Sequence, residues 1–219
     1  ELRCADGGLL TAIVTDAPHM DAHGQLQGVI LTTTDISERK ASEQRIHYLA
    51  THDALTGLAN RAKFLDQVNT SLLIAQRHHT RFALLFLDLD RFKEINDTLG
   101  HPVGDELLIT AARRMRQALR ASDLLARQGG DEFMILLHDI HSMEEALGVA
   151  EKIRHAINQP FTLDGAERLV SVSIGIALYP DHGTSIEILT RNADAAMYRT
   201  KTAGRNGTSA AGDAPSAST

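Results

Sequence analysis

The pattern of apolar and polar residues divides the chain into a β-rich beginning and a mixed remainder. The runs LLTAIVTDA (9–17) and LQGVILTTTDIS (26–37) are apolar and β-branched, and the turn-like DAHGQ lies between them. This pattern predicts two strands joined by a turn. Because so short a β segment is only marginally stable alone, we expect residues 1–36 to be the end of a module whose other strands are missing.

Residues 37–50 form a charged stretch with helical character. ERKASEQRIHYLA places Ile46 and Leu49 on one side of a helix. A polar helix between two modules is either a solvated linker or one strand of a dimeric coiled coil. The stretch is too short for a heptad repeat to decide between the two.

From residue 51 onward the pattern becomes mixed. Asn60 is a good N-cap for a helix over 61–79, and FALLFLDLD (82–90) is a nearly continuous apolar run, as expected for a covered strand. An amphipathic helix follows over 104–120. DLLARQ and DEFMILL then flank Gly129-Gly130, which is a strong hairpin signal.

The remaining segments complete an α-β-α-β-β-α-β-α order. Ser142 and Glu145 predict a capping box for the next helix, 168–180 reads as a strand, and 185–204 reads as a helix that ends at Gly204. The predicted fold class is α/β of the α+β type, with a central, mostly antiparallel sheet, surrounding helices and a β-hairpin. The small, polar residues 207–219 predict a disordered tail.

Composition excludes several classes of function. The net charge of the 219 residues is −6 without a long basic run, which argues against bulk binding of nucleic acid. No apolar stretch approaches the ~20 residues of a membrane span, so we expect no membrane contact within these residues. The single Cys4 excludes an internal disulfide and fits a cytoplasmic location. The chain opens without methionine, which suggests a piece of a longer protein, and that parent protein can be membrane-anchored.

Acidic residues interrupt the apolar strand at its end. In FLDLD the side chains of Phe86, Asp88 and Asp90 share one face, and Leu87 and Leu89 share the other. An acid in an apolar strand is unfavourable unless it is paired or binds a metal. Taken singly, either acid is explained as a cap of the next helix.

The glycine pair introduces a second acidic cluster, Asp131 and Glu132. If the two strands are neighbours, these acids converge with Asp88. Clustered carboxylates repel each other unless a cation lies among them, and oxygen ligands favour Mg²⁺ or Mn²⁺. A pair of such ions is the usual machinery for in-line attack at phosphorus.

Five stretches together resemble the GGDEF family of diguanylate cyclases, from about residue 51 to residue 206. They are HDALTGLANR, LDLDRFKEINDTLGHPVGDELL, ARQGGDEF, VSIGIALYP and DAAMYRTKTAGRN. The resemblance implies a fold related to polymerase palms and class III nucleotide cyclases. It also implies condensation of two GTP molecules into cyclic di-GMP and pyrophosphate. Each domain of the family binds one GTP, so a homodimer is required.

The same resemblance assigns roles to individual residues. Asp88, Asp131, Glu132 and the carbonyl of Leu89 become ligands of two Mg²⁺ (or Mn²⁺) ions per site. Glu132 is either a ligand or acts on the attacking hydroxyl. Substrate binding is assigned by the resemblance to a larger set. Gly129 and Gly130 let the backbone approach the nucleotide, and the turn at Phe92 and Lys93 offers backbone N–H groups to the phosphates. Lys93, Lys201 and Arg205 neutralise the phosphate charges. Asn96 and Asp105 read the guanine. For the last two, a turn-forming Asn and an acid near a helix N-terminus are the plain alternatives.

A further motif of the family is an inhibitory product site. Arg120 and Asp123 in RASD match its RxxD pattern, although a helix-ending Arg followed by a strand-starting Asp is also common. The neighbouring Arg113, Arg114 and Arg116 are expected to form a solvated face. The second arginine that often completes this site is not identifiable in the sequence.

The first segment resembles the end of a PAS sensor domain. DAHGQLQGVILTTTDISERKASEQ matches its last strands, with DISERK as the exit into a signalling helix. The signal is not readable from such a fragment.

For the larger domain, the alternatives to an active cyclase are a GTP- or cyclic di-GMP-binding regulatory module and a purely dimerising domain. The intact acids favour the enzyme.

Overall fold

The computed structural model describes residues 2–3 and 9–212 of the chain. Cys4 and residues 213–219 of the predicted tail lie outside the described residues. The chain divides into two compact units, Glu1–Ala50 and Thr51–Thr219. The boundary agrees with the change of pattern that the sequence shows at residue 51.

The first unit consists of strand pairs followed by a helix. Its elements are β1 (Leu2–Arg3), β2 (Leu9–Leu10), β3 (Ala12–Met20), β4 (Leu26–Asp35) and α1 (Ser37–Thr51). Strands β3 and β4 form the predicted antiparallel hairpin. The Asp21 carboxylate closes the turn, because it accepts hydrogen bonds from the backbone N–H groups of His23 and Gln25, both at 2.8 Å.

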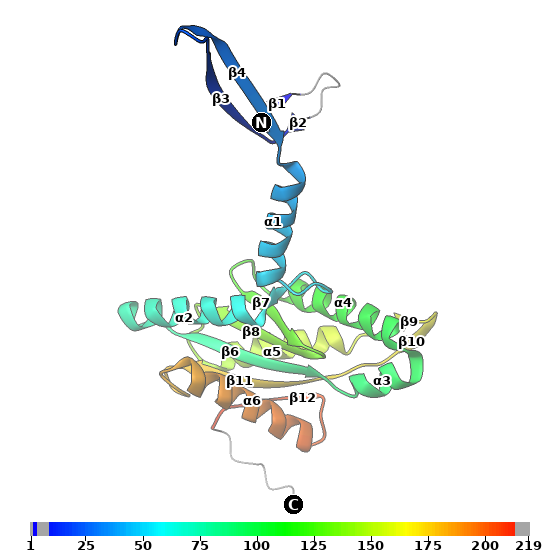
Figure 1. The fold of residues 1–219 in the computed structure, drawn as a ribbon. Helices are drawn as coiled ribbons and strands as arrows, with labels where there is room; N and C mark the ends of the chain where they lie inside the picture. Colours follow the sequence, from blue (N-terminus) through cyan, green and yellow to red (C-terminus); the bar gives the residue numbers. More distant parts are fainter. Residues whose placement is uncertain (1, 4–8, 213–219) are drawn as a thin grey trace, which may run out of the picture. The chain divides into compact units, whose positions relative to one another are not determined.

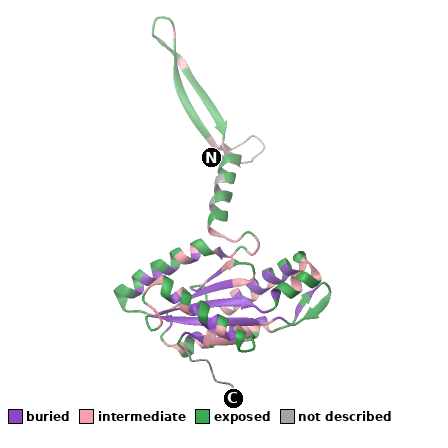
Figure 2. Ribbon diagram, turned by 60° about the horizontal axis from the view of Figure 1, so that its bottom comes forward, coloured by how far each residue is buried: buried purple, intermediate pink, exposed green. Residues whose placement is uncertain are grey.

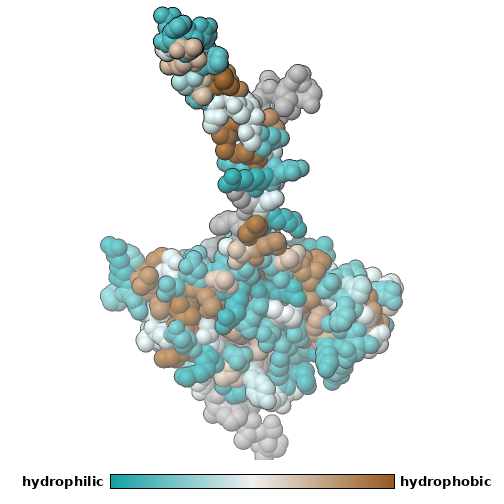
Figure 3. Space-filling view, in the orientation of Figure 1, coloured by the Kyte–Doolittle hydropathy of each residue, from teal (hydrophilic) through white to brown (hydrophobic). Residues whose placement is uncertain are grey.

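The β3–β4 hairpin exposes a large apolar surface. Figure 3 shows apolar side chains gathered along it, and Leu31 is 68% exposed. Ile13, Val29 and Ile30 are also exposed. Two strands without a covering layer are what part of a larger module would present. The PAS resemblance of this unit stays a prediction.

The second unit is built on a six-stranded sheet of order β12-β11-β6-β8-β7-β5 (Figure 1). Its strands are β5 (Ala59–Asn60), β6 (Phe82–Leu89), β7 (Leu124–Gly129), β8 (Glu132–His138), β11 (Val172–Tyr179) and β12 (Gly207–Ala210). The four inner strands pair antiparallel, and the two short edge strands pair parallel to their neighbours. The predicted mostly antiparallel sheet is confirmed.

Five helices and a small hairpin surround this sheet. They are α2 (Arg61–His78), α3 (Phe92–Leu99), α4 (His101–Ala118), α5 (Met143–Ile157), α6 (Ile186–Thr202), and the pair β9 (Phe161–Leu163) and β10 (Ala166–Arg168). Helix α3 and the β9–β10 hairpin were not predicted. Gly100, with φ of 86°, separates α3 from α4. The predicted caps by Asn60 and Ser142 are confirmed, since both side chains accept backbone N–H groups. The capping box of α5 is half formed, because the Glu145 carboxylate accepts the N–H of His141 and not that of Ser142.

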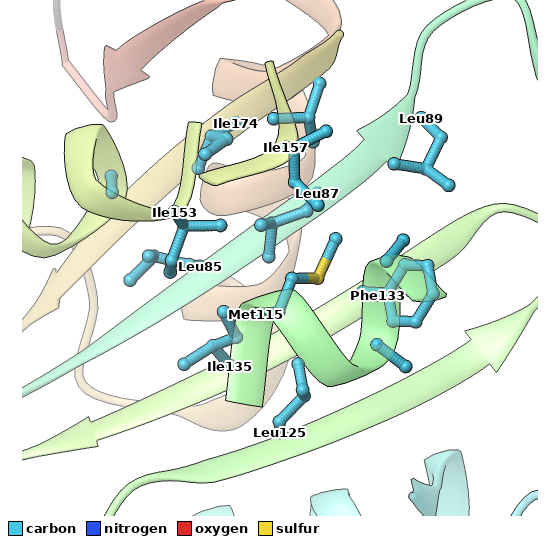
Figure 4. Close-up of a cluster of buried hydrophobic side chains, with 14 of the residues drawn as sticks. Leu85, Leu87, Leu89, Met115, Leu125, Phe133, Ile135, Ile153, Ile157 and Ile174 are labelled. Carbon is cyan, nitrogen blue, oxygen red and sulfur yellow. The ribbon is translucent and has the colours of Figure 1, made fainter. Parts of the chain in front are cut away.

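The alternation along β6 sends its side chains into two separate cores. Leu85, Leu87 and Leu89 pack with α4 and α5 (Figure 4). Leu84 and Phe86 pack with α2 and α6 on the other face. The inner strands are therefore buried on both sides (Figure 2), which explains the nearly continuous apolar run in the sequence.

The prediction of a disordered tail is wrong for its first residues. Gly207–Ala210 form β12, which pairs with β11 along Ser173–Ile176. The Ala211 N–H also donates to the Ile176 carbonyl at 2.7 Å. A small, polar composition predicts disorder because it offers little apolar surface, but an edge strand is held largely by backbone hydrogen bonds.

Within the part of the chain that the structure describes, no helix combines the length and the apolar character of a membrane span.

Candidate active site

The two acidic clusters predicted from the sequence lie side by side. Strand β6 pairs with β8, and Asp88 stands opposite Glu132 in the register. The Leu89 N–H donates to the Asp131 carbonyl at 3.3 Å. The condition that the two strands are neighbours is thus confirmed, and three carboxylates meet at one end of the sheet.

Asp88 is a nearly buried carboxylate in this cluster. It is 6% exposed, and the Lys201 ammonium of α6 contacts its Oδ2 at 2.6 Å. Burial raises the pKa of Asp88 to about 6, and the charge of Asp131 adds to this, while Lys201 opposes it. Burial is also the main cause that raises the pKa of Asp131. Both acids therefore bind a proton, or another cation, more readily than ordinary carboxylates.

The donor set fits a hard divalent cation. Asp88, Asp131, Glu132 and the Leu89 carbonyl supply oxygen atoms only, and Mg²⁺ is commonly held by one or two carboxylates with water completing its shell. Among the described residues, no group of three or more His, Cys, Asp or Glu side chains has a ready-made metal geometry. In this structure Lys201 supplies the positive charge at Asp88. The raised pKa values of Asp88 and Asp131 come mainly from burial, which disfavours their charged forms.

The raised pKa of Asp88 predicts a pH-dependent stability of the metal-free protein. The folded carboxyl keeps its proton up to about pH 6, whereas the ordinary value is 3.8. The resulting stabilisation is fully present below about pH 4 and is lost as the pH rises through 6. Urea unfolding from pH 4.5 to 7.5 should show the free energy of unfolding falling by roughly 1–3 kcal/mol relative to Asp88→Asn. A difference between the two proteins that does not change with pH would contradict this environment for Asp88.

The hairpin turn is braced by an arginine. Gly130 has φ of 53°, a left-handed conformation that favours glycine. Arg127 donates from Nε and Nη2 to the Gly130 carbonyl, at 2.9 and 2.8 Å. Its Nη1 binds both carboxylate oxygens of Asp53, at 3.0 and 3.1 Å. The turn that presents Asp131 is therefore fixed through a side chain from another part of the chain.

Asp53 has two structural roles. It caps a turn, since it accepts hydrogen bonds from the Thr56 N–H and hydroxyl at 2.8 and 2.6 Å. Its ion pair with Arg127 was missed. The acidic and basic residues are both visible in their motifs, but their pairing depends on β5 lying beside β7.

Glu132 has a defined partner. Its Oε2 accepts a hydrogen bond from the Gln128 amide at 2.8 Å. Since Glu132 and Met134 share one side of β8, Glu132 projects to the face covered by α2 and α6, the same face as Asp88. This contact does not distinguish a metal ligand from a residue that acts on a hydroxyl.

Asn96 and Asp105 come together where α3 meets α4. The Asn96 side chain packs directly against Gly104, and a Cβ at this glycine would collide with Asn96 Oδ1. This oxygen is buried without a hydrogen-bond partner, and Asp105 is the exposed residue next to Gly104. The two residues predicted to read guanine therefore lie on adjoining parts of α3 and α4, and their role in binding a base stays a prediction.

The residues assigned to the phosphates differ in their surroundings. Phe92 is buried against the α4 side of the core, so its side chain has a structural role and only its backbone remains for an anion. Lys93 and Arg205 are exposed. Lys201, by contrast, is paired with Asp88.

Arg120 and Asp123 lie at a small cavity of about 170 Å³. Asp123 is 5% exposed, and its carboxylate accepts the backbone N–H groups of Arg120 and His138 at 3.0 and 3.4 Å. The plain alternative for Asp123, a structural acid before a strand, therefore holds in this structure. Lys152 of α5 lines the same cavity. It is a cation beside Arg120 that the sequence did not indicate, because α5 packs against α4 only in three dimensions.

The prediction of a solvated arginine face is wrong for two residues. The Arg114 guanidinium stacks on the Phe161 ring at 3.8 Å and donates to the Gln159 and Pro160 carbonyls at 2.6 Å. Arg116 donates to the Asp123 carbonyl at 2.7 Å. These arginines hold the β9 segment and the RxxD turn, so their charge alone was misleading.

Comparison with known proteins gives the class of this domain. Residues 50–207 match the family model for the diguanylate cyclase GGDEF domain. The chain belongs to this family.

Individual relatives agree with the assignment. Diguanylate cyclase TpbB of Pseudomonas aeruginosa is 48% identical over 153 residues, which is 69% of this chain and 35% of that protein. A structure of the TpbB GGDEF domain gives a TM-score of 0.71 at 46% identity, covering 73% of this chain and 94% of that chain. DgcB from Caulobacter crescentus, solved in complex with cyclic di-GMP, gives a TM-score of 0.72 at 28% identity, covering 80% and 93%. The chain spans only part of the length of the first curated relatives it matches, 23% of one and 35% of another.

Proposed function

We propose that this chain is an active diguanylate cyclase that condenses two GTP molecules into cyclic di-GMP and two pyrophosphates. The observation that carries the proposal is the juxtaposition of the nearly buried Asp88 with the Asp131–Glu132 hairpin, where burial raises the pKa of both aspartates. Buried acids without a charged ligand are unfavourable. An enzyme that must hold cations beside a triphosphate gives these acids a use.

The guanine base is read by Asn96 and Asp105. A carboxylate can accept hydrogen bonds from N1–H and N2–H of guanine together. Adenine lacks this pair of donors. Asn96 carries a buried oxygen without a partner, which a base N–H would satisfy. Losing such polar contacts in a closed site is costly, so selectivity against ATP is expected to be large.

The phosphates are held by backbone and basic groups. The first turn of α3, at Phe92 and Lys93, offers N–H groups at a helix start. Lys93, Lys201 and Arg205 neutralise the phosphate charges, with Lys201 leaving its pairing with Asp88. Gly129 and Gly130 let the backbone approach the nucleotide.

Asp88, Asp131, Glu132 and the Leu89 carbonyl would hold two Mg²⁺ (or Mn²⁺) ions, which would supply positive charge to the attacking and leaving oxygens of an in-line displacement. The 3′-oxygen of one GTP forms a bond to the α-phosphorus of the other, and the bond to pyrophosphate breaks. Glu132 either completes the ion site or receives the hydroxyl proton.

Catalysis requires two copies of the chain. Cyclic di-GMP contains two phosphodiester bonds, each from the 3′-oxygen of one nucleotide to the α-phosphorus of the other. One domain holds one GTP, so both bonds form only when two domains face each other. Because GTP is a cytoplasmic substrate, the domain is proposed to act in the cytoplasm. The first unit is proposed to be the end of a PAS domain that relays a signal through α1.

The alternative is a GTP- or cyclic di-GMP-binding module without turnover. The retained acids Asp88, Asp131 and Glu132 argue for turnover, because a receptor does not need them. Incubation of the purified chain with GTP and Mg²⁺, followed by mass spectrometry of the nucleotides, tests the proposal. Cyclic di-GMP supports it, and bound but unchanged GTP supports the receptor.

Product inhibition at Arg120 and Asp123 gives a separate prediction. Lys152 and Arg120 flank the same cavity, so both are expected to bind the anionic product. Arg120→Ala should keep synthesis within about twofold of wild type and raise the inhibitory concentration of cyclic di-GMP about tenfold or more, the loss of a charged contact. Lys152→Ala should act in the same direction. Initial rates with added product measure both, and an unchanged inhibition curve for the two variants would refute this assignment.

A further inference from the structure

Asp90 is an acid that the proposed chemistry does not use. It follows β6, two residues after Asp88, and is 5% exposed. It does not cap the next helix, since the N-cap of α3 is Arg91 without a side-chain cap. Its carboxylate instead accepts hydrogen bonds from the Ser171 and Ser173 hydroxyls at 2.6 and 2.7 Å and from the Asn206 N–H at 3.0 Å.

The three hydrogen bonds distinguish Asp90 from Asp88. Asp88 has a lysine and a raised pKa, as expected for an acid that lacks enough compensation. Asp90 is satisfied by two hydroxyls and a backbone N–H, all from the protein. Each of its two carboxylate oxygens thus has at least one hydrogen-bond donor from the protein. Asp90 is therefore placed as a structural acceptor.

The segment that Asp90 binds has an uncommon backbone. Arg205 and Asn206 have φ of 65° and 45°, so two successive residues other than glycine are left-handed. Such residues persist only when their surroundings hold them. The Asn206 side-chain oxygen accepts hydrogen bonds from Arg154 Nη1 of α5 at 3.1 Å and from Nδ2 of Asn158, the residue that caps the end of α5, at 2.9 Å. Asn206 is thus fixed by its backbone and by its side chain.

Arg205 is held between two fixed points. Its own N–H donates to the Thr200 carbonyl of α6 at 3.0 Å. The next residue is fixed to Asp90 through its N–H. Asp90, Arg205 and Asn206 all line a cavity of about 680 Å³, which is distinct from the carboxylate cluster because Asp88, Asp131 and Glu132 do not line it. The hydrogen bonds therefore determine where the Arg205 backbone stands beside this cavity.

We propose that Asp90 is a positioning residue, which acts on substrate binding by fixing the Arg205–Asn206 segment and thereby the guanidinium of Arg205. The inference rests on the proposed function, in which Arg205 binds GTP phosphates. It assigns Asp90 no contact with substrate or metal. Asp90 and Asp88 thus have different tasks although they share one strand end.

The shape of asparagine allows the test. Asp90→Asn keeps an oxygen for the Ser171 hydroxyl and the Asn206 N–H, and its amide donates to Ser173. Asp90→Ala removes all three contacts. We expect Asp90→Ala to lower kcat/KM for GTP by about tenfold to a hundredfold, mainly through KM, and Asp90→Asn to stay within about threefold of wild type. Equal loss in both variants would overturn the proposal, because a charge-dependent role such as metal binding would then be required.

A double-mutant cycle identifies the residue through which Asp90 acts. In an Arg205→Ala background, Asp90→Ala should change the GTP affinity and kcat/KM by less than about twofold. Independent, multiplying losses would refute the positioning role. GTP affinity is measured by calorimetry on the same proteins, so the inference remains testable if the wild type binds GTP without forming product. That latter result would refute the proposed function alone.

A second variant covers the case in which Asp90→Ala does not fold. Asn206→Gly removes the oxygen that Arg154 and Asn158 bind, while glycine tolerates the left-handed backbone. It should raise KM for GTP about fivefold, with thermal stability near wild type. Asp164→Gly, at φ of 50° in the β9–β10 turn, is the matched control and should leave KM unchanged. If Asn206→Gly leaves KM unchanged too, the proposal fails.

Discussion

Replacing Asp131 with asparagine is expected to lower the rate of cyclic di-GMP formation about 10³-fold or more, without loss of the fold. Asp131 lies in the hairpin turn beside the end of β6, and in the proposed function its carboxylate binds cations beside a triphosphate. Burial raises the pKa of Asp131, so its charge is unfavourable in the metal-free protein. The thermal stability of Asp131→Asn should therefore equal or exceed that of the wild type near neutral pH.

Asp139 provides the matched control for this substitution. It is an exposed acid just past the other end of β8, with φ of 52°, which asparagine accepts readily. Asp139→Asn should keep turnover within about twofold of wild type, since surface changes away from special features have small effects. Turnover by Asp131→Asn near the wild-type rate would show that this acid does not take part in the reaction.

Gly175→Ala is expected to destabilise the domain by about 3 kcal/mol, the upper end for an overpacked core. Gly175 lies in the middle of β11, where α6 crosses the sheet. An added Cβ would collide with the backbone carbonyl of Ala193 and the N–H of Met197, which are helix backbone and cannot move aside as a flexible side chain would. Because α6 also carries Lys201, activity should fall as well. Chemical denaturation measures the change in the free energy of unfolding.

Gly148→Ala is the control for that measurement. Gly148 is exposed in the middle of α5, and a Cβ there meets no atom within 4 Å. Alanine should stabilise the helix by roughly 0.5–1 kcal/mol. If Gly175→Ala were as stable as the wild type, the close packing of α6 on β11 would be wrong.

Local patterns predicted most of the helices and strands, and they indicated that Asp88 and Asp131 could lie close together. The apolar run of β6 and the glycine pair before β8 are strong short-range signals. The convergence of Asp88 with Asp131 was conditional, because pairing of distant strands is not encoded in either strand alone. Motifs of the resembled family, rather than periodicity, supplied the guanine and phosphate residues.

Most of the features that sequence reasoning missed depend on contacts that form only in the folded chain. Arg114 and Arg116 look like surface charges until their carbonyl acceptors are in place. Lys152 becomes part of a cavity with Arg120 only when α5 packs on α4. The helix-capping interpretation of Asp90 was wrong because its donors lie on β11, on the residue before that strand and after α6. Short elements such as α3 and β12 also carry too few residues for a periodic signal.

In the proposed function, two copies of this chain turn over GTP at the site formed by Asp88 and the hairpin. The most direct test incubates the chain with GTP and Mg²⁺ over a range of chain concentrations and quantifies cyclic di-GMP and pyrophosphate. We expect two pyrophosphates for each cyclic di-GMP. We also expect the rate per chain to rise with chain concentration until all chains are dimeric. GTP that is bound but stays intact at every concentration would contradict it.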